Sequence, residues 1–166
     1  MSITDITIVI TSFKSDKIIR NCLNSIDRQY QIILVENSND LELKKSVERE
    51  FSNVECILTG ENFGYGKANN IGLKKVNTKY ALILNPDATL HKNTLENFFE
   101  AIKQVSGFAI MAPYVQEKKD ENKKIDNKNS SPILVKNVKG FAMFLNMPEF
   151  QDVGFFDEIF FFILKK

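Results

Sequence analysis

The sequence contains few of the side chains that build disulfide-rich and zinc-binding domains. Its 166 residues include two cysteines, Cys22 and Cys56, and one histidine, His91. Both cysteines lie in apolar, periodic segments, which indicates reduced core residues rather than a disulfide framework or a zinc module. His91 lies near the start of the helix predicted at 93–105, and we expect it to be a surface residue without a catalytic role.

The sequence also lacks a large net charge and long apolar runs. Lys and Arg (22) nearly balance Asp and Glu (21), so no strong field is available to hold a polyanion. The longest apolar run, 159–164, is far shorter than the roughly 20 residues of a membrane span. The N-terminus MSITDITIVI lacks the plan of a secretion signal. We therefore expect a cytoplasmic protein without nucleic-acid partners or a transmembrane segment, and peripheral association with the inner face of a membrane stays open.

The length fits one domain, 1–166, with a continuous core. In its first part, 1–115, short segments rich in β-branched residues, which predict strands, alternate with amphipathic segments, which predict helices. Ser15, Asn39 and Asn93 are the expected helix N-caps. Almost no apolar side chains occur in 116–131, which predicts a solvated loop, and 132–166 forms a second part with one or two strands in 133–146. The predicted elements are strands at 6–10, 32–35, 54–58, 80–84 and 108–112, and helices at 15–29, 39–51, 66–76 and 93–105.

Repeated strand–helix units predict an α/β fold with a mostly parallel sheet and helices on both faces. In such sheets ligands bind beyond the carboxyl ends of the strands. The segments that carry candidate ligand-binding residues are therefore 11–14, 36–40, 59–67 and 85–89.

The first two strand ends carry small hydroxyls and a carboxylate. Thr11 and Ser12, followed by Phe13, can hydrogen-bond a ligand or merely terminate the strand. Glu36 can accept a hydrogen bond from a ribose hydroxyl or a base N–H, or can belong to a turn built from the residues that follow it.

The third strand is followed by a glycine-rich loop, GENFGYGKANN. Glycines and Lys67 before a helix are typical of a phosphate cradle, because helix N–H groups favour anions. The loop does not match Walker A, which has a glycine where Glu61 stands and a hydroxyl where Ala68 stands. It also departs from the dinucleotide fingerprint at Asn69.

The fourth strand ends in Asn85-Pro86-Asp87. One carboxylate oxygen at this edge is a suitable ligand for Mg²⁺ or Mn²⁺ when phosphate oxygens supply further ligands. An ordinary Asn-Pro-Asp turn is the alternative interpretation.

Five segments resemble, in order, the motifs of glycosyltransferase family 2, whose members have the GT-A fold, and within it a rhamnosyltransferase-like subgroup. Glu36 stands where the family more commonly has aspartate, and LILNPDATL is similar to the NPD form of the metal-binding D-x-D. The five segments are ITIVITSFKS, LVENSND, NFGYGKANNIGL, LILNPDATL and KGFAMFLNMPEFQDVGFFDEIFFF.

The resemblance implies an inverting, metal-dependent transfer from a dTDP- or UDP-linked sugar to a saccharide or glycolipid acceptor of a surface polysaccharide. Residues 1–115 would be the nucleotide-sugar-binding half and 132–166 an incomplete acceptor-side half. Asp87 would bind Mg²⁺ or Mn²⁺, and Asn85 would orient without adding charge. The implied nucleotide-sugar-binding residues are Thr11, Ser12, Phe13, Glu36, Asn62, Lys67, Asn70, Asn85 and Asp87.

The family's general base comes from an acidic motif after F-D-E-x-F-F, where this sequence ends in ILKK. Protonated lysines cannot accept the acceptor's proton. We therefore expect a truncated chain of little or no activity whose catalytic residue lies at or beyond its end. ATT TTG AAG AAG TAG encodes this ending, and the same bases preceded by one T read Tyr-Phe-Glu-Glu-Val, so a frameshift is one hypothesis and a genuinely short product the other.

Two other functions fit parts of the sequence. The first is a non-catalytic nucleotide-sugar-binding module or partner subunit, which needs no general base. The second is a nucleotidyltransferase, although the segment 11–14 lacks the glycine-rich, arginine-bearing loop expected there.

Overall fold

The computed structural model describes residues 5–114 and 131–159, which contain one six-stranded sheet of order β3-β2-β1-β4-β6-β5. β1 to β4 run parallel to one another, and β6, which lies between β4 and β5, runs antiparallel to both. The predicted mostly parallel α/β sheet is thereby confirmed. The strands are β1 (Ile6–Ser12), β2 (Gln31–Glu36), β3 (Val54–Leu58), β4 (Tyr80–Leu84), β5 (Ile110–Met111) and β6 (Ala142–Asn146).

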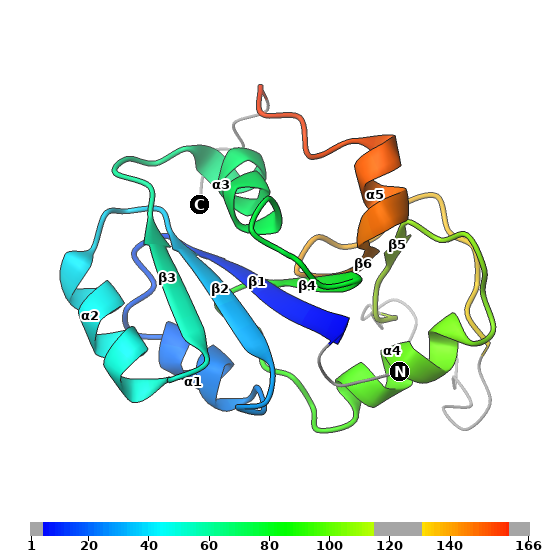
Figure 1. Ribbon diagram of the computed structural model, residues 1–166, viewed down its shortest axis with the longest axis horizontal. Coiled ribbons are helices and arrows are strands. Elements are labelled where there is room, and N and C mark those ends of the chain that lie inside the picture. Colours follow the sequence, from blue (N-terminus) through cyan, green and yellow to red (C-terminus); the bar gives the residue numbers. More distant parts are fainter. Residues whose placement is uncertain (1–4, 115–130, 160–166) are drawn as a thin grey trace, which may run out of the picture.

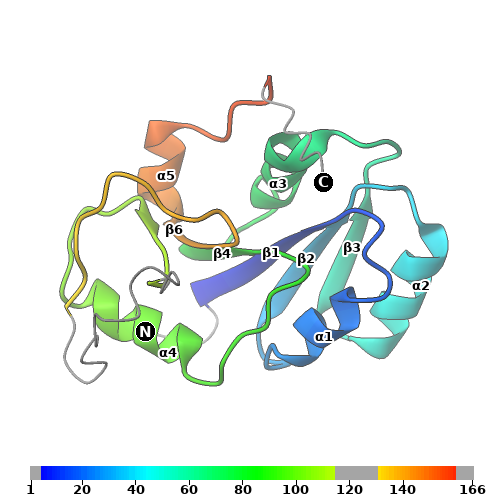
Figure 2. The same ribbon diagram turned by 180° about the vertical axis from the view of Figure 1, so that it is seen from behind.

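Helices cover both faces of this sheet. Figures 1 and 2 show α3 and α5 on one face, and α1, α2 and α4 on the other. None of the helices in the described part of the chain is long and apolar enough to cross a membrane. The helices are α1 (Ile19–Asn24), α2 (Leu41–Glu50), α3 (Gly64–Leu73), α4 (Thr94–Ile102) and α5 (Met147–Val153).

Alternation along the strands divides the core into two clusters. Ile8 and Ile10 of β1 face α1, α2 and α4, whereas Val9 between them faces α3 and α5. Such strands are buried on both faces, which explains why their sequences are almost continuously apolar. Helix α3 lies so close to the sheet that a Cβ on Gly72 would be 2.5 Å from Val9 Cγ1.

The strand positions predicted in the first 84 residues are confirmed, but two predicted helix caps are wrong. Ser15 Oγ donates to the carbonyl of Phe13, and α1 begins after Ile18. Asn39 adopts a left-handed conformation (φ 63°) in the preceding turn, so Asp40 becomes the N-cap of α2. Its side chain accepts from the N–H of Leu43 at 2.8 Å.

The second part of the chain departs further from the sequence-based expectations. Asn93 does occupy the N-cap of α4, but its side chain makes no capping hydrogen bond. The strand predicted at 108–112 shortens to Ile110–Met111, and helix α5 was not predicted. The loop predicted at 116–131 lies, except for residue 131, outside the described residues.

Candidate functional site

The carboxyl ends of four parallel strands meet at one edge of the sheet. Ser12 at the end of β1 is opposite Glu36 at the end of β2, and Ile10 is opposite Leu84 of β4. The four segments that the sequence singled out, 11–14, 36–40, 59–67 and 85–89, therefore follow neighbouring strands at the same edge.

Glu36 points its carboxylate into the turn that follows it. The residue is fully buried (0% exposed), and its oxygens accept from the N–H and hydroxyl of Ser38 and from the N–H of Asp40. These hydrogen bonds satisfy a charge that burial would otherwise penalise. In this arrangement the carboxylate supports the turn and is not presented to solvent.

Asn37, which the sequence analysis did not single out, joins this turn to the glycine-rich loop. Its Oδ1 accepts from the N–H of Phe63 at 3.0 Å, and its Nδ2 donates to Asn62 Oδ1 at 2.9 Å. Asn62 Oδ1 also accepts from the N–H of Gly64, a glycine with φ of 75°. The two asparagines thus fix the loop that begins α3.

Asn69 joins α3 to the end of β1. It is fully buried, and its Oδ1 accepts from the hydroxyl of Thr11 at 3.0 Å, while its Nδ2 donates to the carbonyl of Tyr65. The sequence offered one signal for this role, namely an amide on the apolar side of a helix, where only a specific partner makes burial favourable.

Asn70 is directed away from the strand ends, toward the segment after α5. Its amide pairs with both the N–H and the carbonyl of Phe156, at 3.1 and 2.8 Å, and also donates to Glu158 Oε1. Lys74 Nζ lies 3.8 Å from the same Glu158 oxygen. The structure therefore places Asn70 between the glycine-rich helix and the F-D-E motif.

The segment 154–158 packs against α3 and α5. Phe155 and Phe156 contact the ring of Phe150, with centroids 5.9 and 5.8 Å apart, and Phe156 also meets Tyr65 edge-on. Glu158 Oε1 accepts from Asn70 Nδ2 at 3.0 Å and lies 3.8 Å from Lys74 Nζ, so its carboxylate contributes to the contact between this segment and α3. The motif expected to supply a general base, 163–166, lies outside the described residues.

Two lysines lie at the edge, each beside a phenylalanine. Lys67 Nζ lies 3.9 Å from the ring centroid of Phe63, and Lys14 Nζ lies 5.4 Å from that of Phe13. Phe13 is 43% exposed despite its size. The edge therefore presents an aromatic face and two cationic groups.

Unpartnered oxygens gather where β1 and β4 end. Asn85 Oδ1 and Ser12 Oγ are buried atoms that find no hydrogen-bond partner in the described part of the chain. Asp87 is exposed, and neither an ion pair nor a hydrogen bond within 5–114 and 131–159 engages its carboxylate. A carboxylate and an amide oxygen flanking Pro86 fit a hard divalent cation. The described residues contain no group of three or more His, Cys, Asp or Glu side chains suited to a metal, so such a cation would need oxygens from a bound ligand.

Cys22 lies beneath this corner and donates from its thiol to the Asn85 carbonyl at 3.7 Å. Burial, together with the negative charge of Asp87, raises the pKa of this thiol from 9.0 to about 12. Burial raises the pKa of Cys56 to about 12 as well. The contribution of the two buried thiols to the stability of the fold is therefore fully present below about pH 9. It is lost as the pH rises toward 12, because the unfolded chain then gains charged thiolates that the folded chain does not form.

We expect both cysteines to resist thiol reagents in the folded chain. At pH 8 a rise in pKa from 9 to about 12 lowers the thiolate fraction about 1000-fold, and the thiolate is the reactive form. An Ellman assay at pH 8 should detect almost no thiol in native protein and two per chain in guanidinium. Rapid modification of native protein would contradict the burial of Cys22 and Cys56.

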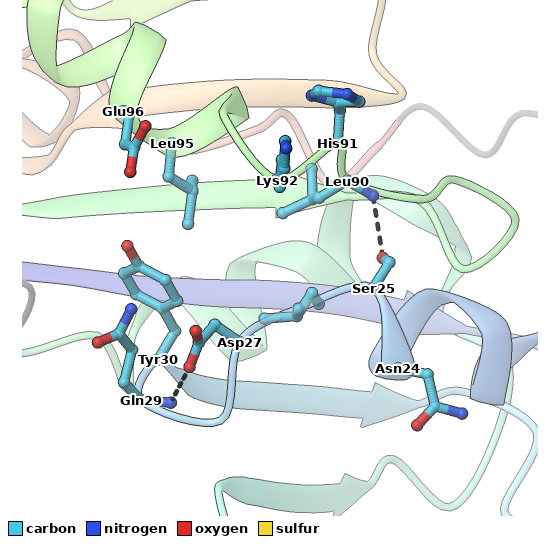
Figure 3. A pocket seen from close by; sticks show the side chains of 11 residues that line it. Asn24, Ser25, Asp27, Gln29, Tyr30, Leu90, His91, Lys92, Leu95 and Glu96 are labelled. Atoms are coloured by element: carbon cyan, nitrogen blue, oxygen red, sulfur yellow. Dashed lines mark hydrogen bonds between the residues drawn. The ribbon is translucent and has the colours of Figure 1, made fainter.

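A separate groove lies on the face of the sheet that α1 and α4 cover, between the loop that joins α1 to β2 and the start of α4 (Figure 3). One wall is the α1–β2 loop with Asp27 and Tyr30, and the other is the start of α4 with Glu96. Burial and the charges of Asp27 and Glu96 raise the pKa of Tyr30. Acidic groups on both walls disfavour a diphosphate here, and His91 and Lys92 also line the groove.

Comparison with known proteins identifies the family. The model of glycosyl transferase family 2 matches residues 7–165, so the chain belongs to that family. A hexosyltransferase of low-salt glycan biosynthesis, Agl10 of Haloferax volcanii, is 28% identical over 115 residues, covering 67% of this chain and 36% of its own length. A teichoic acid poly(glycerol phosphate) polymerase of Staphylococcus epidermidis is 28% identical over 116 residues, covering 65% of this chain and 16% of its own length. The chain thus spans about a third or less of these curated relatives.

Solved structures show that the fold is that of GT-A glycosyltransferases. TarS 1-349 of S. aureus in complex with UDP superposes with a TM-score of 0.68 at 15% identity, covering 94% of this chain and 51% of that one. The mannosyltransferase PcManGT of Pyrobaculum calidifontis, in complex with GDP-Man and Mn²⁺, gives a TM-score of 0.71 at 14% identity, covering 93% and 48%. The fold expected from the sequence is confirmed.

Proposed function

We propose that this chain is the donor-binding part of a glycosyltransferase that moves a sugar from a nucleoside diphosphate to a saccharide or glycolipid acceptor. The observation that carries the proposal is the corner between β1 and β4. There the exposed carboxylate of Asp87 follows the buried Asn85 Oδ1, and neither has a hydrogen-bond partner among the described residues; both lie at the same sheet edge as the glycine-rich loop. Family membership supports the reaction class.

The residues at this edge suit the parts of a nucleotide sugar. The exposed ring of Phe13 offers a stacking surface for a base. Lys14 and Lys67 supply positive charge for a diphosphate, and the α3 N-terminus adds backbone donors. Thr11 donates its proton to Asn69, so toward a ligand its hydroxyl acts as an acceptor. Asn62 shapes the loop, and Asn70 acts on the acceptor side.

We propose Asp87 as the protein ligand of Mg²⁺ or Mn²⁺, with Asn85 beside it. These hard cations prefer oxygen ligands, and the diphosphate would provide the remaining ones. A bound cation would neutralise charge on the departing nucleoside diphosphate as a Lewis acid. The role of Asn85 and Asp87 is to hold two oxygens of different charge on either side of a rigid proline.

The substrates are proposed from the subgroup resemblance and from the relatives. We favour a UDP- or dTDP-linked donor, with rhamnose as one candidate sugar, and inversion at the anomeric carbon. The two curated relatives act in glycan and teichoic acid biosynthesis, which supports a surface-polymer acceptor. Synthesis at the inner, cytoplasmic face of a membrane by a peripherally associated enzyme is consistent with such an acceptor.

Calorimetric titration with UDP, UDP-GlcNAc, GDP-mannose and dTDP-rhamnose tests this function. We expect at least one uridine or thymidine compound to bind in the presence of Mg²⁺ or Mn²⁺, and to bind much more weakly with EDTA. The proposal would be contradicted if none of the four nucleotide compounds bound at millimolar concentration. It would also be contradicted if their affinity were the same with EDTA as with the divalent cation.

A further inference from the structure

Glu36 is a buried carboxylate that forms no ion pair within residues 5–114 and 131–159. Its Oε2 accepts from the N–H of Asp40 at 2.6 Å and from that of Ser38 at 3.2 Å, and its Oε1 accepts from the N–H and hydroxyl of Ser38. Each oxygen therefore already accepts two hydrogen bonds. A nucleobase N–H could reach this carboxylate only by displacing part of its own turn.

The turn held by Glu36 contacts the loops on both sides of it. Ser38 Oγ accepts from the backbone N–H of Lys14 at 3.3 Å, which ties the turn to the β1–α1 loop. Asn37 ties it to the glycine-rich loop through the N–H of Phe63. One carboxylate thus organises three neighbouring loops at the carboxyl edge.

Backbone strain at two non-glycine residues shows that this arrangement needs support. Lys14 has a φ of 51° and Asn39 a φ of 63°. Left-handed conformations of such residues persist only where surrounding contacts fix them. The hydrogen bonds centred on Glu36 and Ser38 supply those contacts.

We propose that Glu36 is a positioning residue, which holds the loops of the donor site in place and does not read the nucleobase. The inference rests on the proposed function, in which those loops bind a nucleoside diphosphate. Glutamate suits the role because its carboxylate, one methylene further from the strand than that of aspartate, can turn back to Ser38 and Asp40 together.

The test compares Glu36→Gln and Ser38→Ala with wild type, using UDP, dTDP, GDP and CDP with Mn²⁺. Glu36→Gln sets an amide N–H₂ against the backbone donors of the turn. We expect affinity for all four nucleotides to fall by one common factor, roughly 10–100-fold, the size typical of losing a residue that orients a ligand-binding group. Ser38→Ala should lower all four affinities by a smaller common factor. Glu55→Gln, which makes the same change at an exposed position, serves as control.

A base-selective change would overturn the inference, for example loss of UDP and dTDP with unchanged CDP. Amide hydrogen exchange without nucleotide gives a second measurement. Glu36→Gln and Ser38→Ala should speed exchange at Asn37 and Phe63, whereas Glu55→Gln should not. If wild type bound none of the four nucleotides, the proposed function would fail, yet unchanged exchange at Phe63 would still refute the positioning role and faster exchange would support it. Ser38→Ala carries the test alone if Glu36→Gln does not fold.

Discussion

Replacing Asp87 with asparagine is expected to abolish the dependence of nucleotide binding on a divalent cation. The exchange keeps the shape of the side chain but removes the free carboxylate that follows β4. Loss of an outer-shell partner alone costs a metal site roughly 10–100-fold in affinity, so loss of a direct ligand should cost at least as much. Titration of UDP with and without Mn²⁺ measures the effect.

Asp27→Asn is the matched control for Asp87→Asn. Asp27 is an exposed carboxylate in the groove of Figure 3, where its Oδ1 accepts from the N–H of Gln29. We expect this variant to bind UDP and Mn²⁺ like wild type. If Asp27→Asn weakened binding and Asp87→Asn did not, the ligand would occupy the groove and the proposed cation ligand would be wrong.

Replacing Gly72 with alanine is expected to destabilise the fold by about 1–3 kcal/mol, the usual cost of overpacking a core. The added Cβ would lie 2.5 Å from Val9 Cγ1 and 3.0 Å from Val35 Cγ2, both in stiff, β-branched side chains of buried strands. Helix α3 must then move away from the sheet. Alanine is the better helix former by about 1 kcal/mol, so a net loss would demonstrate the steric conflict.

Urea unfolding measures this difference, with Gly140→Ala as control. At Gly140 a Cβ would meet, among the described residues, only the hydroxyl of Tyr65 within 4 Å, at 3.8 Å, so stability should change by less than about 0.5 kcal/mol. Gly72→Val should be worse than Gly72→Ala. A Gly72→Ala variant as stable as wild type would contradict the close approach of α3 to β1 and β2.

The sheet was predictable from sequence because its strands carry their own signal. β1, β2 and β4 are buried on both faces, and runs of apolar residues such as 80–84 therefore mark them directly. Local capping was less predictable. Ser15, Asn39 and Asp40 are all acceptable caps, and the tertiary position of the turn decides among them.

The functions of the asparagines were not predictable from local pattern. Asn37 bonds to a residue 26 positions away, Asn69 to one 58 away and Asn70 to one 86 away. A motif shows that an amide occurs at a position, but only the fold brings its partner there. For the same reason the sequence left Glu36 open between a ligand and a turn residue, and its burial favours the turn.

Backbone NMR with UDP and Mg²⁺ is the most direct test of where the donor binds. The account predicts that the largest amide shifts fall within 11–14, 59–67 and 85–88, and that Mn²⁺ in place of Mg²⁺ broadens the signals nearest Asp87. Shifts gathered instead around 24–30 and 90–96, or no shifts at millimolar UDP, would contradict it.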